Sequence, residues 1–153
     1  DFVMNDKCAA GTGRFLEVMS RALEVDIKEM GSMSLLSCNE LHISSVCTVF
    51  AESEVISLLA QGYTKTDIIA AIYRAIGRRL IGLIGQLGKV KEKVVMTGGV
   101  AKSVGLPAVL RRELNTEILI PEKPQINGAL GAAYLGLEQV LEGDKRKLFS
   151  KNC

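Results

Sequence analysis

Two cysteines of this chain are placed where they could do chemistry, because each precedes a segment with helical spacing of apolar residues. Cys8 lies in the run 5–17, and Cys47 lies in the run 44–54. The start of a helix presents unpaired N–H groups and the positive end of a dipole, which stabilise a thiolate for binding a metal or cluster. A [4Fe–4S] cluster needs twice as many thiolates as this pair provides. Two copies of the chain around a twofold axis would complete the set.

A second chemical signal is the run Gly98, Gly99, Val100 and Ala101, which follows a short apolar segment. Two glycines let the backbone come close to a ligand, and the following N–H groups can meet a phosphate or ribose. The same glycine pair also suits a tight turn between a strand and a helix that binds nothing. The tetrapeptide alone leaves both interpretations open.

His42 is the single histidine, and it raises the alternative of a zinc site with Cys8, Cys38 and Cys47. Imidazole and thiolate are suitable zinc ligands, but these gaps are longer than those of compact zinc-binding loops. We therefore expect His42 to be a solvated loop residue and Cys38 to be a small buried apolar side chain.

Composition limits the function classes. With 153 residues, 48% of them hydrophobic and 24% charged, the chain suits one compact globular domain. The net charge of +2 is dispersed, so we expect no nucleic-acid partner. Charged residues interrupt every long apolar run. From the first residues we expect no secretory leader. We predict no membrane partner, a cytoplasmic location and reduced cysteines.

Periodicity predicts helices first and alternating strands and helices later, which is typical of an α/β fold with parallel pairing. We expect Asp26, Thr64 and Asn127 to cap helices, and Pro107 to begin another. The predicted helices cover 15–23, 26–31, 50–62, 67–88, 107–114 and the segment from 127; the predicted strands cover 2–4, 94–97 and 117–120; the boundary of the domain lies at 142, before a polar tail at 143–153.

Four segments carry a resemblance to a known family. They are 5–17, 46–56, 96–101 and 125–133. Together they resemble the ATP-dependent activators of 2-hydroxyacyl-CoA dehydratases, a family that includes ATPase subunits of benzoyl-CoA reductases. The resemblance runs from residue 1 to about residue 137. One difference is Ser103, which stands where relatives often carry Asn.

The resemblance implies a fold and a set of roles. The chain would be the second lobe of an actin-like ATPase fold, shared with acetate kinase, sugar kinases and heat-shock chaperones and related to ribonuclease H. It would be incomplete at its amino-terminal end, because the family's phosphate-binding loops come earlier. Cys8 and Cys47 would ligate a [4Fe–4S] cluster shared by a homodimer, and 98–101 would contact the adenosine of ATP or ADP bound with Mg.

The activity that the resemblance implies is electron transfer driven by ATP. A ferredoxin or flavodoxin would reduce the cluster, and the partner dehydratase or reductase would receive one electron. This chain alone would then lack ATP hydrolysis, although the whole protein is expected to be an ATPase. Two alternatives remain, namely a dimerising or nucleotide-sensing lobe without a cluster and a zinc-stabilised domain.

Overall fold

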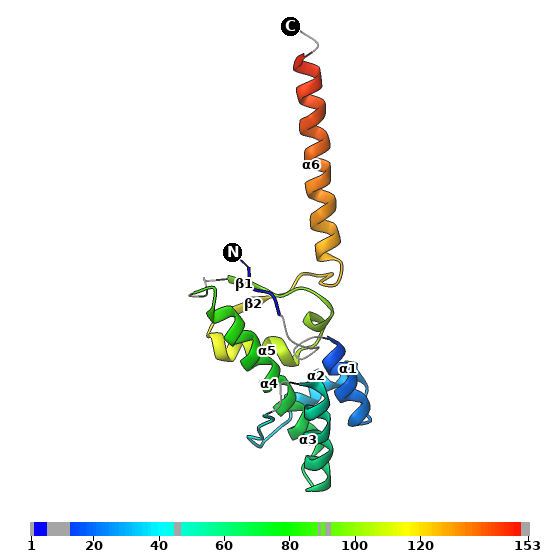
Figure 1. The fold of residues 1–153 in the computed structure, drawn as a ribbon, viewed down its shortest axis with the longest axis vertical. Coiled ribbons are helices and arrows are strands. Elements are labelled where there is room, and N and C mark those ends of the chain that lie inside the picture. The colour runs from blue at the N-terminus through cyan, green and yellow to red at the C-terminus, as the bar shows by residue number, and fades with distance from the viewer. Residues whose placement is uncertain (1, 6–12, 45–46, 89, 91–92, 151–153) are drawn as a thin grey trace.

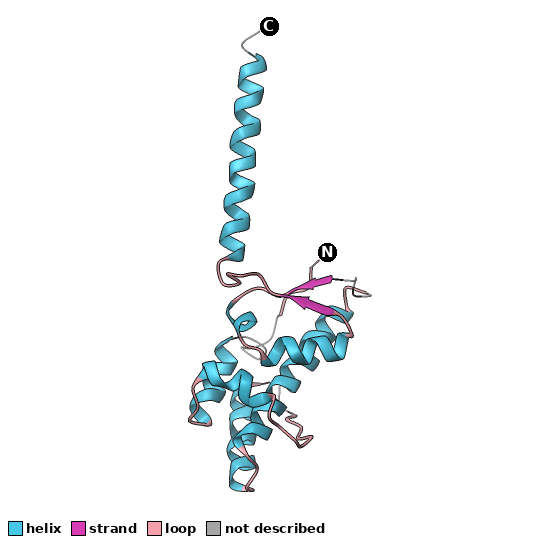
Figure 2. Cartoon of the chain, turned by 180° about the vertical axis from the view of Figure 1, so that it is seen from behind, coloured by secondary structure: helices cyan, strands magenta, loops and turns pink. Residues whose placement is uncertain are grey.

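The structure is a computed structural model that describes residues 2–5, 13–44, 47–88, 90 and 93–150, with the backbone alone from 142 to 150. Helices dominate it, and a small sheet lies near the base of the last helix (Figures 1 and 2). In chain order the elements are α1 (Gly13–Ala22), α2 (Ile27–Ser34), α3 (Thr48–Ala60), α4 (Lys65–Gly85), β1 (Lys93–Val95), the 3-10 helix η1 (Gly99–Lys102), α5 (Gly105–Leu114), β2 (Glu117–Leu119) and α6 (Asn127–Ser150).

The core is built around α4. Its residues Ile68, Ile69, Ile72 and Tyr73 have no exposed surface, and the helix packs mainly against α2 and α5. Helix α1 adds Phe15, Leu16 and Met19 and packs against α3. Because apolar residues recur along α4 at helical spacing, one long helix can bury a continuous stripe.

Two predicted helix caps are confirmed. Thr64 is extended and accepts a hydrogen bond from the Asp67 N–H at 3.2 Å, so it begins α4. Asp26 begins α2 and accepts from the Lys28 N–H at 2.8 Å. In each case a side-chain oxygen satisfies a donor that the first helical turn leaves open.

The predicted parallel pairing of β1 and β2 is also confirmed. Val94 lies opposite Ile118, and the described residues form this single two-stranded sheet. The predicted strand at 2–4 was wrong, since Phe2 and Met4 are exposed and belong to no strand. Residues 41–44 form neither strand nor helix.

Several helix boundaries differ from the predicted ones. Helix α2 continues through Gly31 to Ser34. Helix α5 begins at Gly105, which puts Pro107 at its third position. A proline is tolerated there because N–H groups of the first turn have no partner within the helix. Asn127 is the first residue of α6 rather than its cap.

Gly105 lets α5 approach its neighbours closely. A Cβ atom at this position would lie 2.7 Å from the Ser34 hydroxyl and 2.9 Å from the Tyr73 ring. Both distances are shorter than normal van der Waals contact. A glycine is therefore required where α2, α4 and α5 meet.

Helix α6 projects away from the rest of the molecule (Figure 1). Its side chains from Gly128 to Leu141 are all exposed. The backbone of 143–150, predicted as a polar tail, continues this helix. The division of the chain at residue 142 stays a prediction. In the described part of the chain, no helix is both long and apolar enough to cross a membrane.

Candidate functional site

A cavity of about 380 Å³ opens where α1, α2, α4 and η1 come together. This volume lies within the usual range for small-molecule sites. Its walls combine apolar, hydroxyl and charged side chains with the glycine-rich turn after β1. The lining residues are Gly13, Leu16, Glu17, Ile27, Lys28, Tyr73, Gly99, Val100, Lys102, Ser103 and Gln125.

The turn that enters this cavity requires Gly98. Its φ of 92° lies in the left-handed region that residues with a Cβ atom rarely adopt. The Gly98 N–H donates to the Pro124 carbonyl at 2.8 Å, which ties the turn to the loop before α6. This connection brings Gln125 beside Gly99, both on the wall of the cavity.

The four residues of the predicted nucleotide motif do not all line the same cavity. Gly99 and Val100 line the cavity, and Gly98 forms the turn that precedes them. Ala101 is 2% exposed and lines a neighbouring cavity instead. The assignment of all four to a nucleotide stays a prediction.

Tyr73 and Ser103 form one polar contact in the wall. Their hydroxyl oxygens are 2.7 Å apart, and the Ser103 hydroxyl also accepts from the Gly105 N–H at 3.3 Å. Burial raises the pKa of Tyr73, and the hydrogen bond to Ser103 opposes that rise. Ser103 therefore links the turn after η1 to the middle of α4.

Three charged residues in the wall were missed by sequence reasoning. Glu17 comes from α1, where it also pairs with Arg14 at 2.8 Å, while Lys28 comes from α2 and Lys102 from η1. Lys28 and Lys102 are exposed. Two ammonium groups and a carboxylate at one opening can contact a ligand that carries both hydroxyl and anionic groups. Their separation in sequence left no local pattern to find.

Cys47 lies at the N-cap of α3, as predicted from the segment around it. Its backbone is extended, with φ of −83° and ψ of 132°, and the thiol is free and partly exposed. Its side chain makes no capping hydrogen bond. Helix α3 packs against α1, whose first residue follows Cys8 by five positions. Cys8 itself lies outside the described residues.

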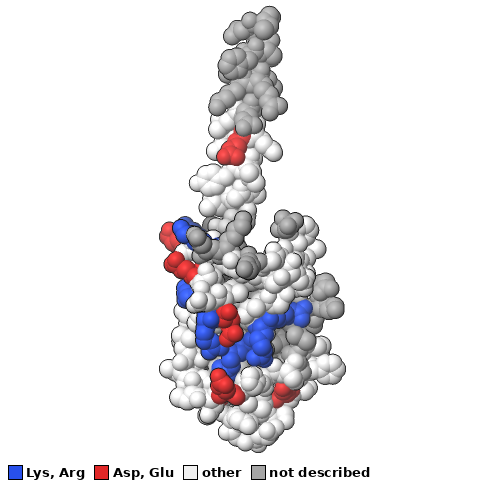
Figure 3. Space-filling view, turned by 90° about the vertical axis from the view of Figure 1, so that its left-hand side faces the viewer, with Lys and Arg blue, Asp and Glu red and all other residues white. Residues whose placement is uncertain are grey.

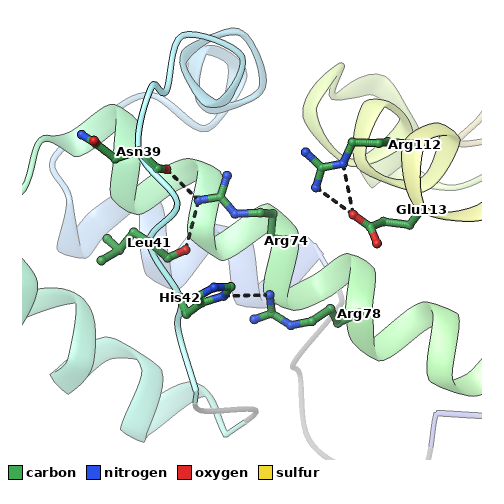
Figure 4. Close-up of polar contacts among 7 residues, drawn as sticks. All are labelled: Asn39, Leu41, His42, Arg74, Arg78, Arg112 and Glu113. Carbon is green, nitrogen blue, oxygen red and sulfur yellow. Dashed lines mark hydrogen bonds and ion pairs between the residues drawn. The ribbon is translucent and has the colours of Figure 1, made fainter.

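The segment that leads to Cys47 is held by side chains from α3 and α4. Arg74 donates to the carbonyls of Asn39 and Leu41, at 3.3 and 3.0 Å (Figure 4). Arg78 donates to the Ile43 carbonyl at 3.2 Å. The Glu54 carboxylate of α3 accepts from the backbone N–H and hydroxyl of Ser44, at 3.0 and 3.1 Å. The backbone is thus held at residues 39, 41, 43 and 44.

Cys38 and His42 are the remaining candidate ligands of the zinc alternative. The expectation that Cys38 is buried was wrong, because its thiol is exposed. His42 meets Arg78, with its Nδ1 atom 3.4 Å from the guanidinium (Figure 4). Among the described residues, no three His, Cys, Asp or Glu side chains are grouped to hold a metal.

Comparison with known proteins identifies relatives that are dehydratase activators. The chain is 51% identical over 145 residues to the 2-hydroxyisocaproyl-CoA dehydratase activator of Clostridioides difficile, covering 95% of this chain and 54% of that protein. It is 53% identical to the (R)-2-hydroxyglutaryl-CoA dehydratase activating ATPase of Acidaminococcus fermentans, covering 87% of this chain and 51% of that protein. The chain therefore spans about half the length of these relatives.

A solved structure agrees with these relatives. The activator of the 2-hydroxyisocaproyl-CoA dehydratase from Clostridium difficile with bound ADPNP superposes with a TM-score of 0.88 at 51% identity, covering 95% of this chain and 54% of that one. The likeness is consistent with an actin-like ATPase fold. Since a family match also extends over residues 1–136, the chain belongs to the BadF/BadG/BcrA/BcrD ATPase family.

Proposed function

We propose that the protein containing this chain is an ATP-driven donor of single electrons to a 2-hydroxyacyl-CoA dehydratase or benzoyl-CoA reductase. The observation that carries the proposal is the identity of 51–53% to two dehydratase activators, together with the 33% identity to a benzoyl-CoA reductase subunit of Thauera aromatica. A ferredoxin or flavodoxin would supply the electron. The partner enzyme, and not this protein, would bind the acyl-CoA substrate.

The proposed electron carrier is a [4Fe–4S] cluster held by Cys8 and Cys47 of each subunit in a homodimer. The position of Cys47 supports this role, because its thiol is free, partly exposed and located at a helix start. A free and accessible thiol can reach iron, which cysteine binds as the thiolate. When bound, the cluster would supply a site that gains and loses one electron.

The chain's own residues would position this ligand. Arg78 holds the Ile43 carbonyl, and Glu54 holds Ser44, three residues before Cys47. Glu54 belongs to α3 and Arg78 to α4, so both helices hold the backbone at 43–44. In this proposal, ATP acts on the electron carrier by moving these helices.

The cavity beside Gly99 is the proposed site for the adenosine of ATP or ADP. The ADPNP-bound relative supports nucleotide binding, and the close backbone approach at Gly99 suits a flat ligand. Mg and the phosphate clamp would come from the rest of the protein. We therefore expect this chain alone to hydrolyse ATP no faster than background.

Anaerobic reconstitution with iron and sulfide tests the proposal. The protein should turn brown and hold about two irons per chain, because two chains share one cluster. Cys8→Ser and Cys47→Ser should abolish the colour and the iron. Cys38→Ser is the matched control, since this thiol is exposed and free in the same segment of the chain, and it should keep both.

The result separates the alternatives. About four irons on a monomeric chain, or a cluster that survives Cys47→Ser, would defeat the shared cluster. A colourless dimer that still binds ADP would indicate a nucleotide-sensing lobe. A colourless protein that holds stoichiometric zinc would indicate a zinc-stabilised domain.

A further inference from the structure

A second cavity, of about 280 Å³, lies where α2, α4 and α5 meet. We propose that it binds a phosphate group, either as inorganic phosphate or as part of a small phosphate ester, between the guanidinium groups of Arg74 and Arg112. It differs from the cavity beside Gly99, with which it shares one lining residue, Tyr73. The lining residues are Ser34, Leu35, Ser37, Ala70, Tyr73, Arg74, Gly105, Ala108, Val109 and Arg112.

The first support is that two arginines line this cavity, Arg74 from α4 and Arg112 from α5. Arg112 points from α5 toward α4, and Arg74 reaches from α4 to the carbonyls of Asn39 and Leu41 (Figure 4). Figure 3 shows that Lys and Arg gather in a patch on one face of the body. Two guanidinium groups at one small cavity form the arrangement that binds phosphate oxygens through several charged hydrogen bonds.

The second support is an unused donor. The Nη2 group of Arg74 donates to the carbonyls of Asn39 and Leu41. Its Nε atom is buried and has no hydrogen-bond partner among the described residues. A buried N–H of a charged group without a partner is costly. An oxyanion in the cavity would supply the missing acceptor.

The third support is electrostatic. Burial lowers the pKa of Arg74, the positive charge of Arg112 lowers it further, and Arg78 adds to the effect. Within the described part of the chain, neither Arg74 nor Arg78 forms an ion pair with a carboxylate. An anion with more than one negative charge would offset this repulsion, which favours phosphate over a single carboxylate.

Three carboxylates near the arginines must be considered. Glu40 and Asp67 favour the charged form of Arg74, but Asp67 already accepts from the side chains of Ser37, Asn39 and Thr64. Glu113 pairs with Arg112 at 2.7 Å, where both side chains are well exposed. An exposed pair of this kind is weak, so it competes with a phosphate only modestly.

Calorimetric titration of the protein with inorganic phosphate, at pH 7 and constant ionic strength, tests the proposal. Arg112→Gln should weaken phosphate binding about tenfold, because it removes charged hydrogen bonds. Arg112 is 62% exposed in its side chain, so the variant should keep its circular dichroism spectrum. Arg112→Lys keeps the charge but loses the planar donor pair, and it should bind with intermediate affinity.

Two further variants make the test specific. Glu113→Gln should strengthen phosphate binding about twofold to threefold, because it frees Arg112 from its competing carboxylate. Arg21→Gln is the matched control, since it removes an exposed arginine of α1 that does not line the cavity, and it should change nothing. Parallel titrations with glycerol 3-phosphate and acetate distinguish an ester, free phosphate and a carboxylate.

Binding of inorganic phosphate or glycerol 3-phosphate that depends on Arg112 and strengthens in Glu113→Gln supports the proposal, and the tighter of the two identifies the source. Three results would overturn it: no measurable binding, binding that persists unchanged in Arg112→Gln, and preference for acetate. Unchanged binding in Arg112→Gln would assign the phosphate to another site, such as the cavity beside Gly99.

Discussion

Helices α4 and α6 are the two longest of the described chain, and they have opposite surroundings. Helix α4 has 21 residues and buries Ile68, Ile69, Ile72 and Ile76 in the core. Helix α6 has 24 residues, and its side chains from Gly128 to Leu141 are exposed. The difference shows that an apolar helical stripe is buried only where other elements are available to cover it.

The apolar residues of α6 recur with the same kind of spacing. Leu130, Tyr134, Leu137 and Leu141 lie on one side of the helix, and each is about half exposed or more. Within the described part of the chain, none of them joins the core. Substitutions in α4 should therefore affect the stability of this chain far more than matched substitutions in α6.

The largest effect is expected for Ile72→Ala. Ile72 is fully buried in α4, so the substitution removes apolar contacts and leaves a cavity. The free energy of unfolding should fall by about 2–5 kcal/mol. Denaturation in urea, followed by circular dichroism, measures it. A loss as small as that of an exposed leucine would mean that α4 is not the centre of the core.

Two glycines, Gly105 in α5 and Gly128 in α6, provide a second comparison of buried and exposed positions. Gly105→Ala should lower the free energy of unfolding by about 1–3 kcal/mol, because the new Cβ atom would collide with Ser34 and Tyr73. Gly128→Ala in α6 meets nothing within 4 Å, and it should raise stability by up to about 1 kcal/mol through helix propensity. The same denaturation experiment measures both, and equal effects would contradict the packing described for α5.

Asp67 at the start of α4 should make the free energy of unfolding depend on pH in the acid range. Hydrogen bonds from Asn39, Thr64 and Ser37 hold the pKa of its carboxyl well below the ordinary value. A lowered pKa in the folded state stabilises the protein above the unfolded pKa of about 4, and this contribution is lost as the pH falls below it. The free energy of unfolding should therefore decrease from about pH 4 toward pH 2.

Asp67→Asn provides the control for that experiment. It removes the titrating group, so the decrease below about pH 4 should be shallower than in the unaltered chain. Identical slopes in the two proteins would assign the acid sensitivity to other carboxylates.

The smallest effect is expected for Leu137→Ala on α6. Leu137 is 54% exposed, so the free energy of unfolding should change by no more than about 0.5 kcal/mol. The same denaturation series includes it as the partner of Ile72→Ala. A loss above about 2 kcal/mol would show that α6 is covered in solution, for example by a second chain.

Local patterns in the sequence determined much of the fold. Thr64 and Asp26 predicted the starts of α4 and α2, the apolar spacing predicted the length of α4, and the strand-turn-helix rhythm predicted parallel pairing of β1 and β2. Each of these features depends on groups within a few residues of one another, and such groups meet whatever the rest of the chain does. The position of Cys47 before α3 followed in the same way.

Tertiary structure alone decided the rest. Arg74 reaches carbonyls 33 and 35 residues away, and the hydroxyls of Tyr73 and Ser103 meet across 30 residues. The two cavities combine side chains from several helices, so no local spacing could reveal Lys28, Gln125 or Arg112. The burial of α4, the exposure of α6 and the exposure of Cys38 were also decided by tertiary packing. Side chains far apart in sequence come together only when the packing of the helices places them there, because periodicity indicates a face of a helix but not what covers it.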